Sequence, residues 1–392
     1  MEISKRRTTI FFVVLVFFAG SNIGSIAGIG IIFKMASNAL TLYILYLLAN
    51  QILRRHAIKK VSLITIFYLL YLGVYIAVTL FIGEESLQES ILSMIKSGIS
   101  LVWLDQQMRE DYTVLDGPIM AAFYVWCILD TVITFIYPGG APFLNGGYIL
   151  GWKNNKIMYF VILHLLSNYH YIRLRNQKKK INFMILWITM IVGSVLNALL
   201  IESSTTAVVI FLLVLFVPLR RLITRMPFTN GKFVLIFHLL CFILLIFVRE
   251  LFQEPLNEIM QLLFEKDATF TGRIYIWRVA MVMIVESPLI GYGKYPAQIA
   301  VLPGGYLYSW TMAHNQILDL MMRGGVIILI LWLSTLIASV HTKRRRSIYS
   351  KLSIYTMFCF LFFFHTEASM DALSYLIFLS IYLIGNTKIA RV

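Results

Sequence analysis

The chain has 392 residues, of which 59% are apolar and only 14% are charged, and its mean hydropathy is +0.80. A soluble globular domain is about half apolar and about a quarter charged, so this composition excludes an ordinary soluble fold and indicates a polytopic membrane protein. The net charge of +15 does not indicate nucleic acid, because no stretch is long enough to build a basic folded surface.

The first element is an apolar run from Thr8 to Phe33 that follows Lys5, Arg6 and Arg7. It is too long for the apolar core of a signal peptide and lacks an obvious cleavage site of small residues. We therefore expect a first membrane span here rather than a leader.

Apolar segments of the length needed to cross a membrane, about 20 residues, recur along the whole chain. They predict about twelve spans, near 8–33, 36–53, 61–82, 88–104, 117–137, 157–172, 181–200, 204–219, 233–248, 316–340, 352–366 and 372–386. The segment 88–104 carries Lys96 and could lie in the interface, but removing it would move every later loop to the other side. The cysteines Cys127, Cys241 and Cys359 fall inside these apolar spans and have neither disulfide nor metal-binding spacing.

Basic residues are concentrated in alternate loops. Of the 34 lysines and arginines, 24 lie in segments that the predicted spans assign to one side of the membrane. Such a bias marks the cytoplasmic side and orients helices during insertion. We therefore expect both termini in the cytoplasm.

Two loops on the opposite side stand out. One, 138–156, is rich in glycine, proline and asparagine, and the other runs from Arg249 to Ala313. The second is far longer than a connection between packed helices needs, and loops of that length usually carry function. The expected organisation is one integral membrane domain, 1–392, with 249–315 as its large extracytoplasmic loop.

Short helices and turns are predicted inside the long loop. Leu251 to Phe264 has apolar residues at helical spacing, which suits a helix lying on the membrane surface. Arg273 to Glu286 predicts a second helix that stops before Pro288. Glycine clusters at 291–293 and 303–305 then indicate turns.

Two arginines of this loop are candidate anion ligands. Arg273 stands where the second loop helix is predicted to begin, and backbone N–H groups and the helix dipole favour an anion there. Arg278 is five residues further on, about 140° round an ideal helix. The two could grip separate ends of a long ligand, or they could simply extend to the outer headgroups.

Polar residues near the tenth predicted span form a second candidate group. His314 and Asn315 precede this span, and Asp319 and Arg323 lie within it. Ionisable residues at such positions usually serve function, although Asp319 and Arg323 could equally form a self-neutralising pair at i,i+4. Glu367 follows His365 in the break between the last two spans and can face the same aqueous pocket as His314. Asp130 lies mid-span and is expected to face the bundle interior.

Several signals are absent from the sequence. There is no Asp-x-Asp near a membrane boundary, no Walker loop and no His-Glu-x-x-His. Metal-bound sugar nucleotide, ATP and zinc are therefore poorly supported, and no cofactor or metal is expected. A ligand that is already lipid-linked and activated fits better.

These residues together carry a family resemblance. The series Thr271-Gly272-Arg273-x3-Trp277, Ser287-Pro288-Leu289-Ile290-Gly291-x-Gly293 and Ala313-His314-Asn315-x2-Leu318-x5-Gly324 resembles the O-antigen polymerase and O-antigen ligase family. The segments 151–155 and 202–206 also look compatible with it. The family often has an arginine where this chain has Ser203-Ser204, and a glutamate where Arg323 stands, so roles at those places do not carry over.

The resemblance implies a glycosyltransferase of the GT-C-like type in the bacterial inner membrane, with its active site towards the outer leaflet. The donor would be a growing chain on undecaprenyl diphosphate, and the acceptor a new lipid-linked repeat unit of an O-antigen, capsule or exopolysaccharide. We expect a catalytic group of Arg273, Arg278, His314 and Glu367. Arginines would stabilise the leaving diphosphate without metal, and His314 would orient or deprotonate the acceptor, with Glu367 as an alternative base. Substrate contacts are expected from Lys153, Arg249, Asn315, Trp277 and Tyr292.

Two rival functions remain open at this point. A ligase of the same family would use nearly the same chemistry to transfer a finished chain to another acceptor. A flippase for lipid-linked oligosaccharide would instead show internal repeats and charges spread along a central pathway, and no repeat is visible. The expected partners are the bilayer and the lipid-linked oligosaccharide, with a chain-length regulator as a further candidate, and not nucleic acid.

Overall fold

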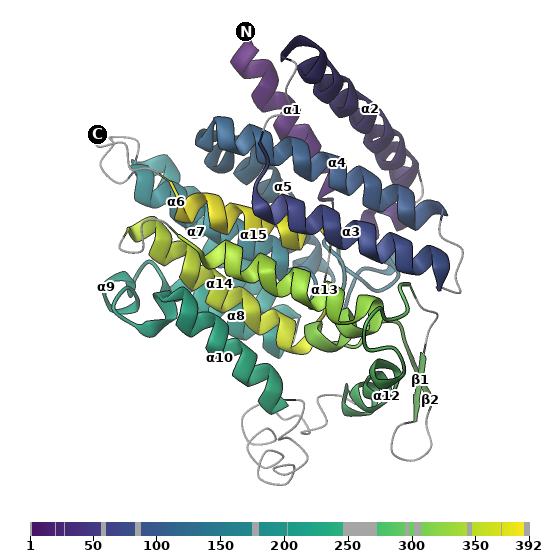
Figure 1. The fold of residues 1–392 in the computed structure, drawn as a ribbon. Coiled ribbons are helices and arrows are strands. Elements are labelled where there is room, and N and C mark those ends of the chain that lie inside the picture. Colours follow the sequence, from purple (N-terminus) through teal and green to yellow (C-terminus); the bar gives the residue numbers. More distant parts are fainter. Residues whose placement is uncertain are drawn as a thin grey trace.

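A computed structural model of the chain has the architecture drawn in Figure 1. The structure describes residues 2–19, 21–26, 28–55, 60–82, 88–174, 180–201, 203–245, 273–294, 298–301, 307–342, 347–369 and 371–387. The predicted surface helix 251–264, the turn at 303–305 and Arg249 lie outside these residues.

The first predicted span is interrupted. Helix α1 (Glu2–Phe17) ends early, a short 3-10 helix η1 (Ser21–Ser25) follows, and α2 (Ile29–Arg55) begins only at residue 29. The prediction of one continuous span over 8–33 is therefore wrong. Glycine, serine and asparagine between residues 20 and 28 disfavour a continuous helix, and Gly28 adopts a positive φ of 78°.

Each of the other predicted spans overlaps a helix. Their bounds are α3 (Leu63–Phe81), α4 (Gln88–Glu110), α5 (Met120–Ile136), α6 (Ile157–Leu174), α7 (Lys180–Leu200), α8 (Ser204–Leu215), α10 (Gly231–Ile243), α13 (Gln316–Val340), α14 (Ile348–Thr366) and α15 (Ala372–Gly385). Shorter elements are η2 (Tyr112–Val114), η3 (Leu115–Ile119), η4 (Pro142–Leu144), α9 (Arg220–Ile223), η5 (Pro227–Thr229) and α12 (Arg273–Glu286). The predicted loop helix 273–286 is thus confirmed.

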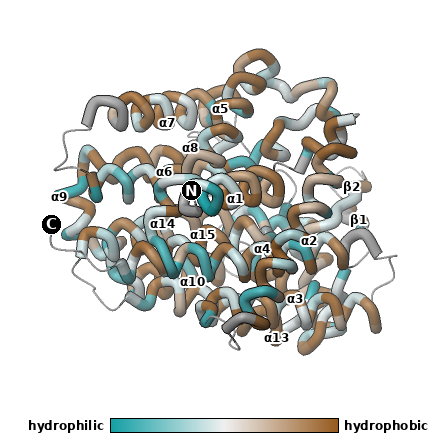
Figure 2. The backbone as a smooth tube through the Cα atoms, turned by 90° about the horizontal axis from the view of Figure 1, so that it is seen from above, coloured by the Kyte–Doolittle hydropathy of each residue, from teal (hydrophilic) through white to brown (hydrophobic). Residues whose placement is uncertain are grey.

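Five helical segments within the described residues are long and apolar enough to cross a membrane. They are Ile29–Leu53, Leu63–Phe81, Tyr112–Ile136, Gln316–Val340 and Ile348–Thr366, and four shorter apolar helices accompany them. Large apolar side chains also remain exposed on the outside of the bundle, among them Phe81, Leu199 and Phe211. Figure 2 shows that α5 and α7, at the edge of the bundle, consist largely of hydrophobic residues. Such surfaces suit acyl chains, so the chain is a multi-pass, all-α membrane protein.

Helices α14 and α15 form the centre of the bundle. Nearly all their side chains are buried, against α6, α8 and α10 around α14 and against α3, α4 and α13 around α15. Helix α2, in contrast, is mostly exposed and lies at the periphery. The break between α14 and α15 therefore lies inside the protein, and a polar group placed there needs protein partners.

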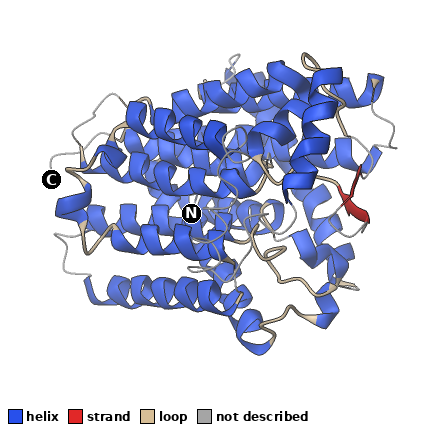
Figure 3. Ribbon diagram, turned by 90° about the horizontal axis from the view of Figure 1, so that it is seen from below, coloured by secondary structure: helices blue, strands red, loops and turns tan. Residues whose placement is uncertain are grey.

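A small β-hairpin, which was not predicted, lies beside α12 at one end of the bundle (Figures 1 and 3). Strands β1 (Gln298–Val301) and β2 (Leu307–Trp310) pair antiparallel, with Gln298 opposite Trp310.

Glycines fix α12 against α13. Helix α13 is broken at Gly324 and Gly325, which frees two carbonyls: Tyr292 N donates to Met322 O at 2.7 Å, and Gly293 N donates to Arg323 O at 2.9 Å. A Cβ on Gly325, whose φ is +58°, would lie 2.2 Å from backbone atoms of Leu289. Only glycine allows this close approach. The approach holds residues 289–293, which follow α12, against α13, and Arg273 lies at the opposite end of α12.

Candidate active site

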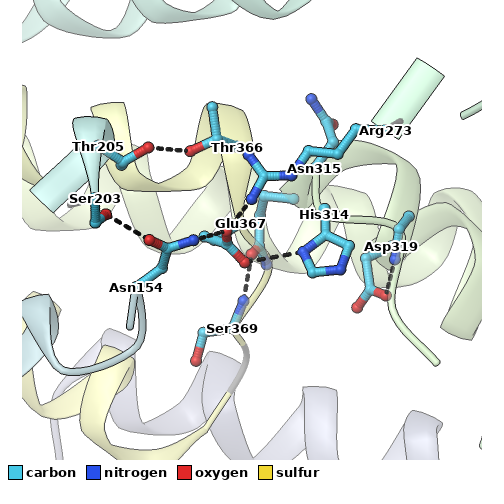
Figure 4. A network of polar contacts seen from close by, with 12 residues as sticks. Asn154, Ser203, Thr205, Arg273, His314, Asn315, Asp319, Thr366, Glu367 and Ser369 are labelled. Carbon is cyan, nitrogen blue, oxygen red and sulfur yellow. Dashed lines mark hydrogen bonds and ion pairs between the residues drawn. The ribbon is translucent and has the colours of Figure 1, made fainter. Parts of the chain in front are cut away.

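Glu367 stands at the centre of a polar cluster inside the bundle (Figure 4). It is the residue that ends α14, with an extended backbone (φ −139°, ψ 163°), so its side chain leaves the helix at the break before α15. The residue is only 2% exposed. A carboxylate in such a place is costly unless hydrogen-bond donors surround it.

Three donors from distant parts of the chain supply those bonds. Arg273 Nη2, from the first residue of α12, donates to Oε1 at 2.5 Å. His314 Nδ1, from the segment before α13, lies 3.0 Å from Oε2. Asn154 Nδ2, from the loop before α6, also donates to Oε1. Glu367 therefore joins four segments, and Figure 4 shows their side chains pointing towards it.

The contact between His314 and Glu367 fixes the histidine tautomer. An ionised carboxylate only accepts hydrogen bonds, so Nδ1 must carry the proton in this contact. Nε2 is then free to accept a proton, and within the described part of the chain it has no hydrogen-bond partner. The His314 side chain is 24% exposed, so this nitrogen can be reached by a ligand. The pair has the arrangement of a general base and the group that orients it.

The backbone at His314 is held in an unusual conformation. Its φ of +49° is in the left-handed region that residues other than glycine rarely adopt. The neighbouring Ala313 is held from both sides, because its N donates to Asp319 Oδ1 at 3.2 Å and its carbonyl accepts from Trp277 Nε1 at 2.8 Å. Surrounding contacts thus maintain the strain, which is a common property of functional residues.

Asn154 was not predicted, although its neighbour Lys153 was. Its Oδ1 accepts from Ser203 Oγ at 2.5 Å, and Ser203 caps α8 by accepting from Thr206 N. The amide therefore has one orientation, with its nitrogen towards Glu367. The signal for both residues lay in the segments 151–155 and 202–206, but nothing in the sequence placed them beside Glu367.

A buried ion pair holds the loop that carries Asn154. Lys156 Nζ lies 2.7 Å from Asp130 Oδ2, and both side chains are fully buried. Leu150 N donates to the other oxygen of Asp130 at 3.0 Å, and the ammonium lies over the ring of Tyr148. Burial lowers the pKa of Lys156, while the Asp130 carboxylate opposes that shift. The expectation that Asp130 faces the interior is confirmed.

The predicted residues around the start of α13 serve its structure. Asn315 is fully buried and caps the helix, accepting from Ile317 N and Leu318 N, and its amide reaches His365 O at 3.3 Å. Arg323 Nε donates to Asp319 Oδ2 at 2.6 Å. Of the two alternatives given for Asp319 and Arg323, the structure contains the self-neutralising salt bridge.

The remaining predicted residues lie around the cluster rather than in it. Arg278 is exposed, with its guanidinium over the ring of Tyr275 at 5.9 Å. Trp277 is buried against the Ala313 carbonyl. Tyr292, at the other end of α12 from Arg273, donates to Met283 O. Lys153 is exposed beside Asn154. The structure thus brings together Arg273, His314 and Glu367 of the predicted catalytic group.

The cluster lies at the opposite end of its helices from the basic loops. Arg173 is in the last turn of α6, α9 carries Arg220 and Arg221 after α8, and residues 343–346 connect α13 to α14. The cluster instead gathers just before the first residues of α6, α8 and α13 and just after the last residue of α14. In Figures 1 and 2, α9 and the C-terminus lie on one side of the molecule and the hairpin on the other.

Comparison with known families gives a match over part of the chain. Residues 188–333 match a family model described as O-Antigen ligase. The resemblance predicted from the sequence is confirmed. The matched segment, 188–333, contains Arg273 and His314, whereas Asn154 and Glu367 lie outside it. No curated protein and no solved structure matches the chain.

Proposed function

We propose that the protein is a glycosyltransferase that polymerises lipid-diphosphate-linked repeat units into a surface polysaccharide. The observation that carries this proposal is the meeting of Arg273 and His314, both in the matched segment 188–333, on one buried carboxylate, Glu367. A cation can stabilise the departing diphosphate, and a histidine of fixed orientation can take the proton of the attacking hydroxyl.

In the proposed reaction, an acceptor sugar hydroxyl attacks the anomeric carbon of the donor sugar. The new C–O bond forms as the bond from that carbon to the diphosphate oxygen breaks. The hydroxyl proton moves to His314 Nε2, and the electron pair leaves with the lipid diphosphate. Glu367 orients His314 and stabilises its protonated form, in the way a carboxylate supports a histidine base.

Arg273 is assigned to the leaving diphosphate. One of its five N–H groups binds Glu367, and its side chain is 18% exposed, so other donors can meet an oxyanion. Its place at the start of α12 adds the positive end of the helix dipole. Arg278 and Lys153, both exposed, are assigned to the more distant phosphate and the headgroup. Trp277 and Tyr292 are assigned to substrate contacts in the same region. Arg249 is assigned to the same anion.

The topology assigned to this function has about twelve crossings in a bacterial inner membrane, in a GT-C-like arrangement, with both termini in the cytoplasm. It is supported by the basic loops at the end of the helices opposite the cluster, since positive loops remain in the cytoplasm. The reaction then occurs on the outer leaflet side, within the one membrane domain and beside its loop 249–315. A chain-length regulator could bind the same side.

Ligation is the second candidate, because the matching family model carries the description O-Antigen ligase. The two activities differ in the acceptor and not in the chemistry. Purified protein given only the lipid-linked repeat unit should produce a ladder of longer lipid-linked chains if it polymerises. A ligase would leave that substrate unchanged and would need a second acceptor, and an absence of transfer with either acceptor would contradict glycosyl transfer altogether.

A further inference from the structure

A cavity of about 560 Å³ opens directly beside Glu367. Ala368 and Ser369, the two residues after Glu367, line it, and α3, α4, α13 and the start of α15 form its other walls. Its volume lies within the range of roughly 300–1,000 Å³ of small-ligand sites. The exposure of Asp371 in its wall indicates that the cavity is open to solvent.

One wall of the cavity is a row of tyrosines on α3. Tyr68, Tyr71 and Tyr75 lie on one face of that helix, and the rings of Tyr71 and Tyr75 stack at 5.9 Å. Tyr75 accepts a hydrogen bond from Arg323 Nη1 at 3.0 Å. The hydroxyls of Tyr68 and Tyr71 have no hydrogen-bond partner among the described residues. A buried tyrosine normally finds such a partner, so both hydroxyls are available to hydrogen-bond a ligand in the cavity.

The charges in the wall disfavour a phosphate. Arg323 is the one cation among the described lining residues, and it already binds Asp319, Tyr75 and the Thr311 carbonyl. Asp319 and Asp371 are both in the wall, so the carboxylates outnumber the guanidinium. An anion is repelled from such a site, and an acyl chain would leave the hydroxyls of Tyr68 and Tyr71 without partners. A neutral ligand rich in hydroxyl groups fits both conditions.

We propose that this cavity is the acceptor-glycan site, in which Tyr68, Tyr71 and Asp371 bind sugar hydroxyls of the incoming repeat unit. This inference rests on the proposed function, and it separates the two substrates: the donor diphosphate meets Arg273, and the acceptor sugar lies between α3 and α15. The sequence Glu367-Ala368-Ser369 leads from the cluster into the cavity, so the cavity begins beside the carboxylate that binds His314. Asp319 connects the cluster with the cavity, because it accepts hydrogen bonds from Ala313 N, next to His314, and from Arg323 Nε in the cavity wall.

The test measures glycan binding without turnover. The probe is the lipid-free oligosaccharide released by mild acid from the lipid-linked repeat units of the cell that makes the protein. Its binding to the full-length protein in nanodiscs is followed by saturation-transfer NMR and titration calorimetry. The variants are Tyr71→Phe, which removes one hydroxyl, and Asp371→Asn, which keeps the cap of α15 while removing the charge. Tyr43→Phe, on the exposed face of α2, is the matched control.

We expect the two cavity variants to raise the dissociation constant by about tenfold each, as loss of a ligand hydrogen bond predicts. Tyr43→Phe should bind the glycan like the wild type, and inorganic pyrophosphate should not displace it. Wild-type binding by both cavity variants, displacement by pyrophosphate, or no binding to the wild type would each overturn the inference. The chain-elongation assay tests the proposed function separately, so elongation without glycan binding in this cavity would refute the acceptor site alone.

Discussion

His314 Nδ1 and Glu367 Oε2 lie 3.0 Å apart across 53 positions of the chain. This contact gives the histidine one tautomer and leaves Nε2 as its free acceptor. It also joins the segment 188–333 to the break between α14 and α15, which the matching family model does not cover. Folding therefore assembles the proposed catalytic unit from these two parts of the chain.

Replacing His314 with glutamine should lower the rate of chain elongation by about 10²–10⁴-fold, because a general base is lost. Glutamine can still donate to Glu367, so the loop should keep its position. His341→Gln is the matched control, since His341 is an exposed histidine at the other end of α13. Elongation is measured as radiolabelled polymer per minute at equal protein. Equal losses in both variants would contradict a specific role for His314.

Glu367→Gln should cost nearly as much activity as His314→Gln, and the double variant should cost little more than either one. Residues that act as a unit are not additive in their effects. The neutral amide cannot stabilise protonated His314, and it leaves the guanidinium of Arg273 without its carboxylate. Glu286→Gln, at the exposed end of α12, serves as control. Fully additive losses would show that the two residues work independently.

Arg273→Lys should reduce elongation by about 10²–10³-fold even though the charge remains. A lysine cannot bind Glu367 and a phosphate oxygen through a planar set of donors, and loss of one preorganised donor at a developing oxyanion has an effect of this size. Arg225→Lys, exposed beyond α9, should leave the rate unchanged. If Arg273→Lys retained wild-type elongation, the assignment to the leaving group would be wrong.

Chelation should leave elongation unchanged. Among the described residues, the carboxylate at the centre of the cluster is Glu367. It is already occupied by donors from Arg273, His314 and Asn154, so it offers no free pair of oxygens to a divalent cation. The measurement compares rates after dialysis against EDTA with rates after adding back Mg²⁺ or Mn²⁺. A loss restored by either ion would refute metal-independent transfer.

Local sequence patterns were sufficient to predict most helices. Apolar length located nearly all of them, and Arg273–Glu286 was predicted to the residue because Pro288 and the glycines after it give clear stop signals. The first span was mispredicted because apolar content between residues 8 and 33 concealed a break at glycine and serine. The hairpin was missed because its strands are only four residues long.

The sequence predicted which residues belong to the candidate site, but not which of them contact one another. Arg273, His314 and Glu367 were each expected from position, yet nothing local showed that one carboxylate would receive both of the others. That meeting depends on how α12 packs on α13 through Gly291 and Gly325. Asn154 was missed for the same reason, since its partner Ser203 is 49 positions away.

The buried pair of Lys156 and Asp130 provides a test of how that site is supported. Lys156→Met should destabilise the protein by about 3–5 kcal/mol, because it leaves the Asp130 carboxylate uncompensated in the bundle interior. The double variant Lys156→Met with Asp130→Leu should recover much of that loss, since an apolar pair of similar volume needs no desolvation of charge. Unfolding is followed by thermal denaturation in detergent.

Lys153→Met is the matched control, because Lys153 is exposed three residues earlier in the same loop, and it should unfold like the wild type. A Lys156→Met protein with wild-type stability would show that the pair does not hold the loop. Because this loop also presents Asn154 to Glu367, the double variant offers a second measurement. Recovered stability with reduced elongation would indicate that the ion pair, beyond its contribution to stability, positions Asn154 for the reaction.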